Sequence, residues 1–133
     1  MIVVDTSVLS LALRRRRTSD ADPVLANLLD LIDRDEALLV GPVRQEILTG
    51  IREHDQFKAL RTRLRAYPEA DPVREDFETA AEMFNACQAV GVQGSDADFL
   101  LCAMAARLDT PIFTTDKDFE RYAKHLPIRL YAG

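Results

Sequence analysis

Short apolar runs alternate along the chain with apolar positions at helical spacing. The runs predict buried β-strands, and apolar residues recurring every three or four positions predict amphipathic helices. Strands are expected at residues 2–4, 37–40, 111–114 and 128–131. Helices are expected at residues 7–13, 23–33, 43–47, 53–67, 73–90 and 96–108, and from residue 116 onward. Strands separated by helices predict an α/β fold with a parallel sheet.

Local sequence signals mark the boundaries of several of these elements. Gly91 ends one helix, and Ser95 is a good N-cap for the next one. The helix at residues 96–108 is apolar nearly all round, so we expect it to be central and buried. Residues 68–72, Pro-Glu-Ala-Asp-Pro, are expected to form a loop that is too short to separate two domains.

Length and composition fit a single globular domain at residues 1–133. Hydrophobic residues make up 47% of the chain and charged residues 29%, as is usual for globular proteins. The formal net charge is −5, so no overall basic field attracts nucleic acid, and any such contact must be local or bridged by a metal. No apolar run approaches the roughly 18–20 residues of a membrane span, so no membrane contact is expected.

The two cysteines give no sign of a metal site or a disulfide framework. Cys87 and Cys102 lie in apolar helical stretches without Cys-x-x-Cys or Cys/His spacing. We therefore expect both to be small core residues in a reducing compartment. This pattern does not indicate zinc, and it favours a cytoplasmic location.

Four acidic residues occupy positions that are typical of a ligand site in an α/β fold. Asp5 and Asp116 each follow a short apolar strand, whereas Glu46 and Asp98 are each expected early in a helix. Ligands gather outside the carboxyl ends of parallel strands, where Asp5 and Asp116 should lie. Clustered carboxylates repel one another unless a cation neutralises them, and the sequence offers no obvious basic partner. The pattern therefore predicts a site for Mg²⁺ or Mn²⁺.

Further polar residues lie next to these acids or in the first loop. Hydroxyl groups suited to orienting carboxylates or water are carried by Thr6, Ser7 and Thr114. The first loop contains a run of four basic residues, Arg14, Arg15, Arg16 and Arg17. This run either forms a solvated loop or contacts the backbone of an RNA.

Each acidic residue also has an ordinary structural explanation. Asp5 could be the N-cap of the helix that follows it, and Glu46 could be a solvated helix residue. Asp98 follows Ser95 by three positions, as in a capping box, and the neighbouring Asp96 shares this explanation. Acidic residues can also simply stabilise the positive end of a helix, which applies to Asp116 and Asp118. The prediction of a metal site therefore depends on the four acids occurring together.

Four short segments carry the acids in a recognisable order. They are residues 3–7 (Val-Val-Asp-Thr-Ser), 42–47 (Pro-Val-Arg-Gln-Glu-Ile), 98–103 (Asp-Phe-Leu-Leu-Cys-Ala) and 112–119 (Ile-Phe-Thr-Thr-Asp-Lys-Asp-Phe). Together they resemble the four acidic motifs of PIN domains, in particular those of VapC-like toxins. The likeness extends over nearly the whole chain, and the Thr-Thr-Asp-Lys-Asp-Phe segment is its most specific part. It implies a three-layer α/β/α fold with a central, mostly parallel sheet.

The resemblance also implies a function. VapC-like proteins are metal-dependent endoribonucleases that hydrolyse RNA phosphodiester bonds, are usually homodimers, and act as the toxin of a toxin–antitoxin pair held inactive by a cognate antitoxin. Asp118 matches a position in the family whose acid contributes less to the site than the four main acids do. The additional Asp96, beside Asp98, leaves open which of these two aspartates faces the metal. Carried over position by position, the catalytic acids are Asp5, Glu46, Asp98 and Asp116, and the metal ligands are Asp5, Asp98 and Asp116.

Other classes of protein share parts of this pattern. A binding module with a PIN-like fold would keep the fold without cutting RNA, although the presence of all four acids argues against it. An aspartyl-phosphate phosphatase also starts with a strand followed by an aspartate, here Asp5 as the nucleophile. That fold prefers a second aspartate two residues later, where this chain has Ser7. Release of phosphate from a monoester, measured against RNA cleavage, separates the two enzyme classes.

Overall fold

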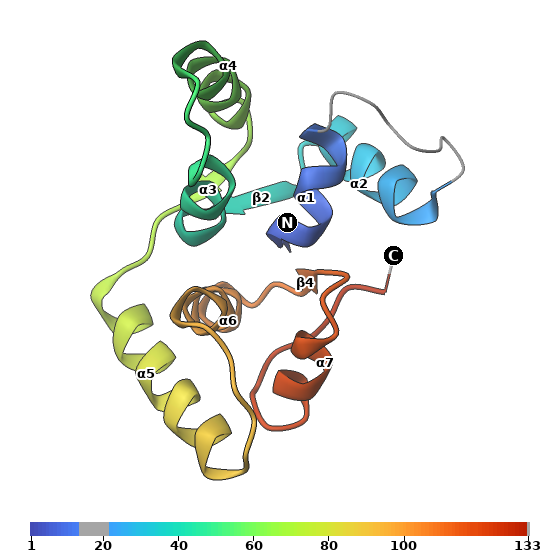
Figure 1. The fold of residues 1–133 in the computed structure, drawn as a ribbon. Coiled ribbons are helices and arrows are strands. Elements are labelled where there is room, and N and C mark those ends of the chain that lie inside the picture. The colour runs from blue at the N-terminus through green and yellow to red at the C-terminus, as the bar shows by residue number, and fades with distance from the viewer. Residues whose placement is uncertain (14–21, 133) are drawn as a thin grey trace.

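The protein has a four-stranded parallel sheet with helices on both sides (Figure 1). The computed structural model describes residues 1–13 and 22–132, and every structural statement below refers to these residues. The strands are β1 (Ile2–Val4), β2 (Ala37–Val40), β3 (Glu69–Ala70) and β4 (Ile112–Phe113), in the order β3-β2-β1-β4. Each neighbouring pair is parallel, so the carboxyl ends of all four strands lie at one edge of the sheet.

Helices fill the connections between these parallel strands, and one further helix follows β4. They are α1 (Thr6–Leu13), α2 (Pro23–Asp33), α3 (Gly41–Leu48), α4 (His54–Leu64), α5 (Arg74–Ala89), α6 (Asp96–Leu108) and α7 (Asp118–Ala123). In Figure 1, α1 packs with α2 and α5 packs along α6. The three-layer α/β/α fold with a parallel sheet is thereby confirmed.

The core is built from the strands and from α6. All four residues of β2 are buried, as are Val3 and Val4 of β1. Helix α6 buries Phe99 and the whole stretch from Leu101 to Ala105, as its apolar sequence predicts. Both cysteines are free and buried. The first turn of α6 is less buried than this stretch, and it carries Asp98.

Two expectations about the strands were wrong. Residues 68–72 contain strand β3, which pairs with β2 and receives a hydrogen bond from Leu39 N–H to the carbonyl of Pro68 at 2.8 Å. This strand is only two residues long and stands between prolines, so it shows no alternation of apolar and polar residues. At residues 128–131 the chain forms only a single parallel bridge, between Leu130 and Ile112, instead of a strand.

Ion pairs and caps fix the helices around this core. Asp76, of which only 1% is exposed, accepts two hydrogen bonds from the Arg107 guanidinium, at 2.8 and 2.9 Å, and one from Val73 N–H. This contact joins the start of α5 to the end of α6. Within the described residues, no helix combines the length and the apolar character needed to span a membrane.

Candidate metal centre and adjoining groove

Asp5 lies directly after β1 and is held by two hydroxyl groups. Its Oδ2 accepts hydrogen bonds from Ser7 Oγ and Thr114 Oγ1, both at 2.8 Å. Its backbone N–H donates to the carbonyl of Phe113, which joins the ends of β1 and β4. The side chain is nearly buried, with 6% of the residue exposed, and no backbone N–H of the described residues donates to it. The Asp5 carboxylate is therefore oriented by hydroxyls and does not act as an N-cap.

Asp116 lies in the turn after β4, next to the same hydroxyls. Its N–H donates to Thr114 Oγ1 at 3.0 Å, and its Oδ1 accepts the N–H of Asp118 at 2.9 Å. The N–H of Thr115 donates to Ser7 Oγ at 3.1 Å. The Asp116 side chain thus closes a turn of its own, which is why the helix begins at Asp118 and not at Asp116. These bonds tie the turn to the start of α1.

Asp98 is the third residue of α6, and its carboxylate turns toward the other two aspartates. Its N–H donates to Ser95 Oγ at 3.1 Å, but its Oδ2 accepts the hydroxyl of Tyr122 at 2.8 Å, so only half of the capping box forms. Burial raises the pKa of Asp98; the Tyr122 hydrogen bond partly lowers it, and the charges of Asp5 and Asp116 raise it again. The Asp98 carboxylate is therefore close enough to those of Asp5 and Asp116 to be repelled by them.

Tyr122 is the residue at this site that the sequence did not reveal. It is completely buried, and its ring lies against Phe99 and Phe119. Burial and the hydrogen bond to Asp98 raise the pKa of its hydroxyl far above the ordinary value, so it stays protonated and remains a donor. The only sequence signal was spacing, since Tyr122 lies four residues after Asp118 and hence on the same side of α7.

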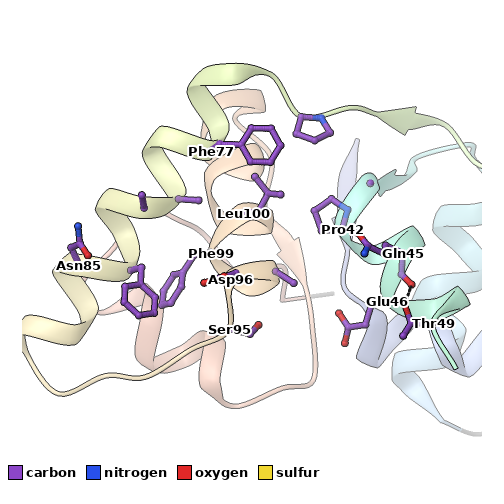
Figure 2. A pocket seen from close by; sticks show the side chains of 16 residues that line it. Pro42, Gln45, Glu46, Thr49, Phe77, Asn85, Ser95, Asp96, Phe99 and Leu100 are labelled. Carbon is purple, nitrogen blue, oxygen red and sulfur yellow. Dashed lines mark hydrogen bonds between the residues drawn. The ribbon is translucent and has the colours of Figure 1, made fainter.

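Glu46 is not early in its helix, as the sequence suggested, but sixth of eight residues. The helix starts at Gly41 because Pro42, in the first turn, lets α3 follow β2 without a loop. Figure 2 shows the Glu46 side chain extending from α3 toward Ser95 at the start of α6. Glu46 lines a groove whose lining does not include Asp5, Asp98 or Asp116.

A groove of about 980 Å³ runs between α3 and α5 over one side of α6 (Figure 2). Most of its lining is apolar, and the largest of these residues are Pro42, Pro72, Phe77, Phe84, Phe99 and Leu100. Glu46 and Asp96 are its acidic residues, and Ser95 lies with them. The groove thus adjoins the first turn of α6, which carries Asp98, while Asp96 faces the groove.

Comparison with known proteins identifies the family. The family model described as the PIN domain matches residues 2–125. This chain belongs to the PIN domain family. The resemblance to PIN domains is thus confirmed, and no curated protein matches the chain as a relative.

Several solved structures share the fold of this PIN domain. FitAcB from Neisseria gonorrhoeae has a TM-score of 0.76 at 20% identity, covering 98% of this chain and 96% of that chain. VapBC2 from Rickettsia felis, bound to a DNA fragment from its promoter, has a TM-score of 0.76 at 18% identity, with 98% of each chain covered. A toxin-antitoxin complex from Klebsiella pneumoniae has a TM-score of 0.68 at 16% identity, with 90% of each chain covered.

The donors of this PIN domain fit a hard, hydrated cation. Three carboxylates approach one another, and no basic side chain of the described residues pairs with Asp5, Asp98 or Asp116. No three acidic, histidine or cysteine side chains of residues 1–13 and 22–132 converge tightly enough to enclose an ion. Mg²⁺ requires no such enclosure, because it keeps several waters and binds through one or two carboxylates plus substrate phosphate. These oxygen ligands fit Mg²⁺ or Mn²⁺, which favour carboxylate and water ligands.

The remaining predicted residues have different surroundings. The Thr6 hydroxyl is buried and has no hydrogen-bond partner among the described residues, so it does not orient a carboxylate as Ser7 and Thr114 do. Asp118 forms an exposed ion pair with Arg121 at 3.3 Å. The candidate RNA-binding arginines lie outside the described residues, and they are Arg14, Arg15, Arg16 and Arg17.

Proposed function

We propose that this PIN domain is a metal-dependent endoribonuclease that acts as the toxin of a toxin–antitoxin pair. The observation that carries the proposal is the approach of Asp5, Asp98 and Asp116 at the carboxyl edge of the sheet, with no basic partner in the described part of the chain. PIN domains are generally nucleases, which supports hydrolysis of a phosphodiester bond as the reaction.

In this proposal Asp5, Asp98 and Asp116 hold Mg²⁺ or Mn²⁺. Such an ion, when bound, neutralises the scissile phosphate and lowers the pKa of a bound water. The chain supplies the orientation of its own ligands: Ser7 and Thr114 hold Asp5 through Oδ2. Nearly complete burial of Asp5 keeps it out of bulk water, which strengthens its interaction with a cation.

Glu46 acts from the groove side in this proposal. No hydrogen bond within the described residues fixes its carboxylate, which extends toward the start of α6 (Figure 2). A carboxylate that is free to turn can accept a proton from an attacking water once substrate is bound. We therefore assign Glu46 to proton transfer and the three aspartates to the metal.

The proposed substrate is single-stranded or looped RNA. The three aspartates lie at the sheet edge beside the groove, and an unpaired strand can bend a phosphate toward them where a stiff duplex cannot. The net charge of −5 gives no general attraction for RNA, so local basic residues must hold its backbone. Arg14, Arg15, Arg16 and Arg17 remain the proposed contact.

The proposed partners are a cognate antitoxin and a second copy of the chain, in the cytoplasm. The Klebsiella pneumoniae structure with the same fold is a toxin-antitoxin complex, which supports the first of these partners. Co-expression with the neighbouring reading frame, followed by mass measurement of the purified complex, tests both. Recovery of a monomer at all concentrations would contradict the homodimer.

The decisive experiment is RNA cleavage by purified protein freed of any antitoxin. With Mg²⁺ or Mn²⁺ we expect internal cuts in unpaired RNA, and none with a chelator. Asp98→Ala and Asp116→Ala should each lose most of the rate while remaining folded, because the ion loses a ligand. Asp33→Ala, which removes an exposed acid at the end of α2, is the matched control and should keep full activity.

Two outcomes would overturn this function. Cleavage that resists the chelator, or full activity of the Asp116→Ala variant, would point to a contaminating nuclease or to a binding module that does not cut. Release of phosphate from a monoester without RNA cleavage would instead favour a phosphatase with Asp5 as its nucleophile.

A further inference from the structure

The packing of the Tyr122 ring holds its hydroxyl in a hydrogen bond to one carboxylate oxygen of Asp98. The donor–acceptor distance to Oδ2 is 2.8 Å, and no part of Tyr122 is exposed. Its ring centroid lies 5.0 Å from that of Phe99 and 5.1 Å from that of Phe119, in tilted and edge-on contacts. Aromatic pairs in this range restrict the ring, so the hydroxyl cannot turn to another acceptor without repacking the core.

Gly94 makes room for this hydroxyl. A Cβ atom at residue 94 would lie 2.4 Å from Tyr122 Oη, 2.8 Å from its Cζ and 2.9 Å from Phe99 Cε2. Separations this short force atoms to move, and both neighbours are themselves buried rings. The φ angle of Gly94 is not positive, so the need for glycine is one of space and not of backbone conformation. The loop before α6 can pass over Tyr122 only because residue 94 lacks a side chain.

The donors at this site share one chemical property, which is neutrality. Asp5 Oδ2 accepts from the hydroxyls of Ser7 and Thr114, and Asp98 Oδ2 accepts from the hydroxyl of Tyr122. A hydroxyl orients a carboxylate without cancelling its charge. A lysine or arginine in the same place would neutralise the carboxylate and compete with a metal ion.

We propose that Tyr122 is a positioning residue that holds the Asp98 carboxylate in place for a divalent cation, and that Gly94 is required for Tyr122 to reach it. This inference rests on the proposed function, because it assigns Asp98 to the metal. Removing an outer partner of a ligating group usually weakens metal binding by about 10–100-fold. A purely structural tyrosine would leave the metal affinity unchanged.

The test is a titration of Mn²⁺ into metal-free protein by calorimetry, without RNA. Tyr122→Phe keeps the ring and its contacts with Phe99 and Phe119, and removes only the hydroxyl. We expect its Kd for Mn²⁺ to rise about 10-fold or more. Tyr67→Phe is the matched control, because it removes a hydroxyl from a second tyrosine, which is partly buried, precedes β3 and lies away from Asp98. It should leave the Kd unchanged.

A second variant tests the role of Gly94. Gly94→Ala should also weaken Mn²⁺ binding, because the new methyl group displaces the Tyr122 hydroxyl. In the Tyr122→Phe background the same change should have a smaller further effect, since the closest contact, 2.4 Å to Oη, no longer exists. Thermal unfolding of each metal-free variant establishes that it is folded. Fully additive effects on the Kd would overturn the link between the two residues.

The failure of this inference can be told apart from failure of the proposed function. If the wild-type protein binds no Mn²⁺, or if the Asp98→Asn variant binds Mn²⁺ as tightly as the wild type, then both the proposed metal site and the proposed role of Tyr122 are refuted. If the wild type binds Mn²⁺ through Asp98 and folded Tyr122→Phe binds it with the same Kd, only the positioning role is wrong.

Discussion

Replacing Asp98 by asparagine should stabilise the metal-free protein and abolish its stabilisation by metal. Asparagine has nearly the same shape, and its side-chain oxygen can still accept the Tyr122 hydroxyl, so the change removes mainly the charge. Burial and the charges of Asp5 and Asp116 raise the pKa of Asp98 in the folded state. The ionised carboxylate therefore costs folding free energy at pH 7 when no cation is present.

The pH dependence follows from the direction of this shift. A carboxyl group with a raised folded-state pKa destabilises the fold above that pKa and ceases to do so as the pH falls and it takes up a proton. The stability advantage of Asp98→Asn over the wild type should therefore be largest near pH 7. It should shrink as the pH is lowered toward the ordinary aspartate value of about 3.9.

A bound metal ion stabilises the wild-type fold, whereas the charge of Asp98 alone destabilises it, and the size of the stabilisation can be calculated. A cation at 100 times its Kd stabilises the folded state by about 2.7 kcal/mol if it binds only that state. For a chain of 133 residues this raises Tm by about 10 °C. The wild type should show this rise with Mg²⁺ or Mn²⁺, whereas Asp98→Asn should show little or none.

Thermal unfolding with and without metal, at several pH values, measures both terms. Asp96→Asn is the matched control, because it removes the same charge two residues away from an exposed position in the groove. It should keep the rise in Tm. If Asp98→Asn loses as much stability without metal as with it, Asp98 is a structural residue and the reasoning is refuted.

Two further predictions concern other acids. Burial raises the pKa of Asp76, but the hydrogen bonds and charge of the Arg107 guanidinium, together with the hydrogen bond from Val73 N–H, outweigh this and hold the pKa below its ordinary value. The ionised Asp76 therefore stabilises the fold above the ordinary aspartate pKa, and this stabilisation disappears as the pH falls through the folded-state pKa. Asp76→Asn should therefore cost about 1–2 kcal/mol in urea unfolding at pH 7 and less at acidic pH, below the ordinary aspartate pKa, and an equal loss at both would contradict the assignment. Glu46→Gln should slow RNA cleavage at least 10-fold yet leave the Kd for Mn²⁺ unchanged, and a weaker Kd would place Glu46 among the metal ligands.

The sequence predicted those parts of the fold in which one short segment determines its own structure. The buried strands β1 and β2 and the all-apolar helix α6 are found where their patterns placed them. Strand β3 was missed because two residues between prolines carry no periodic signal, and their pairing with β2 arises only from the tertiary fold. The expected strand at residues 128–131 failed for a related reason, since at the edge of the sheet it forms one bridge beside β4.

At the candidate site, strand ends were a better guide than helix positions. Asp5 and Asp116 follow β1 and β4, and the parallel pairing of these strands puts both residues at one edge of the sheet. Glu46 was placed wrongly in its helix because the sequence does not show that α3 starts at Gly41 without a loop. Tyr122 was missed because its contact with Asp98 joins α7 to α6 across 24 residues of sequence.

In the described part of the protein, buried and half-buried carboxylates have two different kinds of partner. Asp76 receives a guanidinium from its own chain, which pairs with both carboxylate oxygens and completes the ion pair inside the fold. Asp5 and Asp98 receive only neutral hydroxyls, although they lie close enough to each other to repel. Since like charges that are removed from water are costly without a cation, the arrangement at the sheet edge is favourable only when positive charge comes from outside the described residues. The contrast with Asp76 is the physical reason for assigning a metal to one place and a structural role to the other.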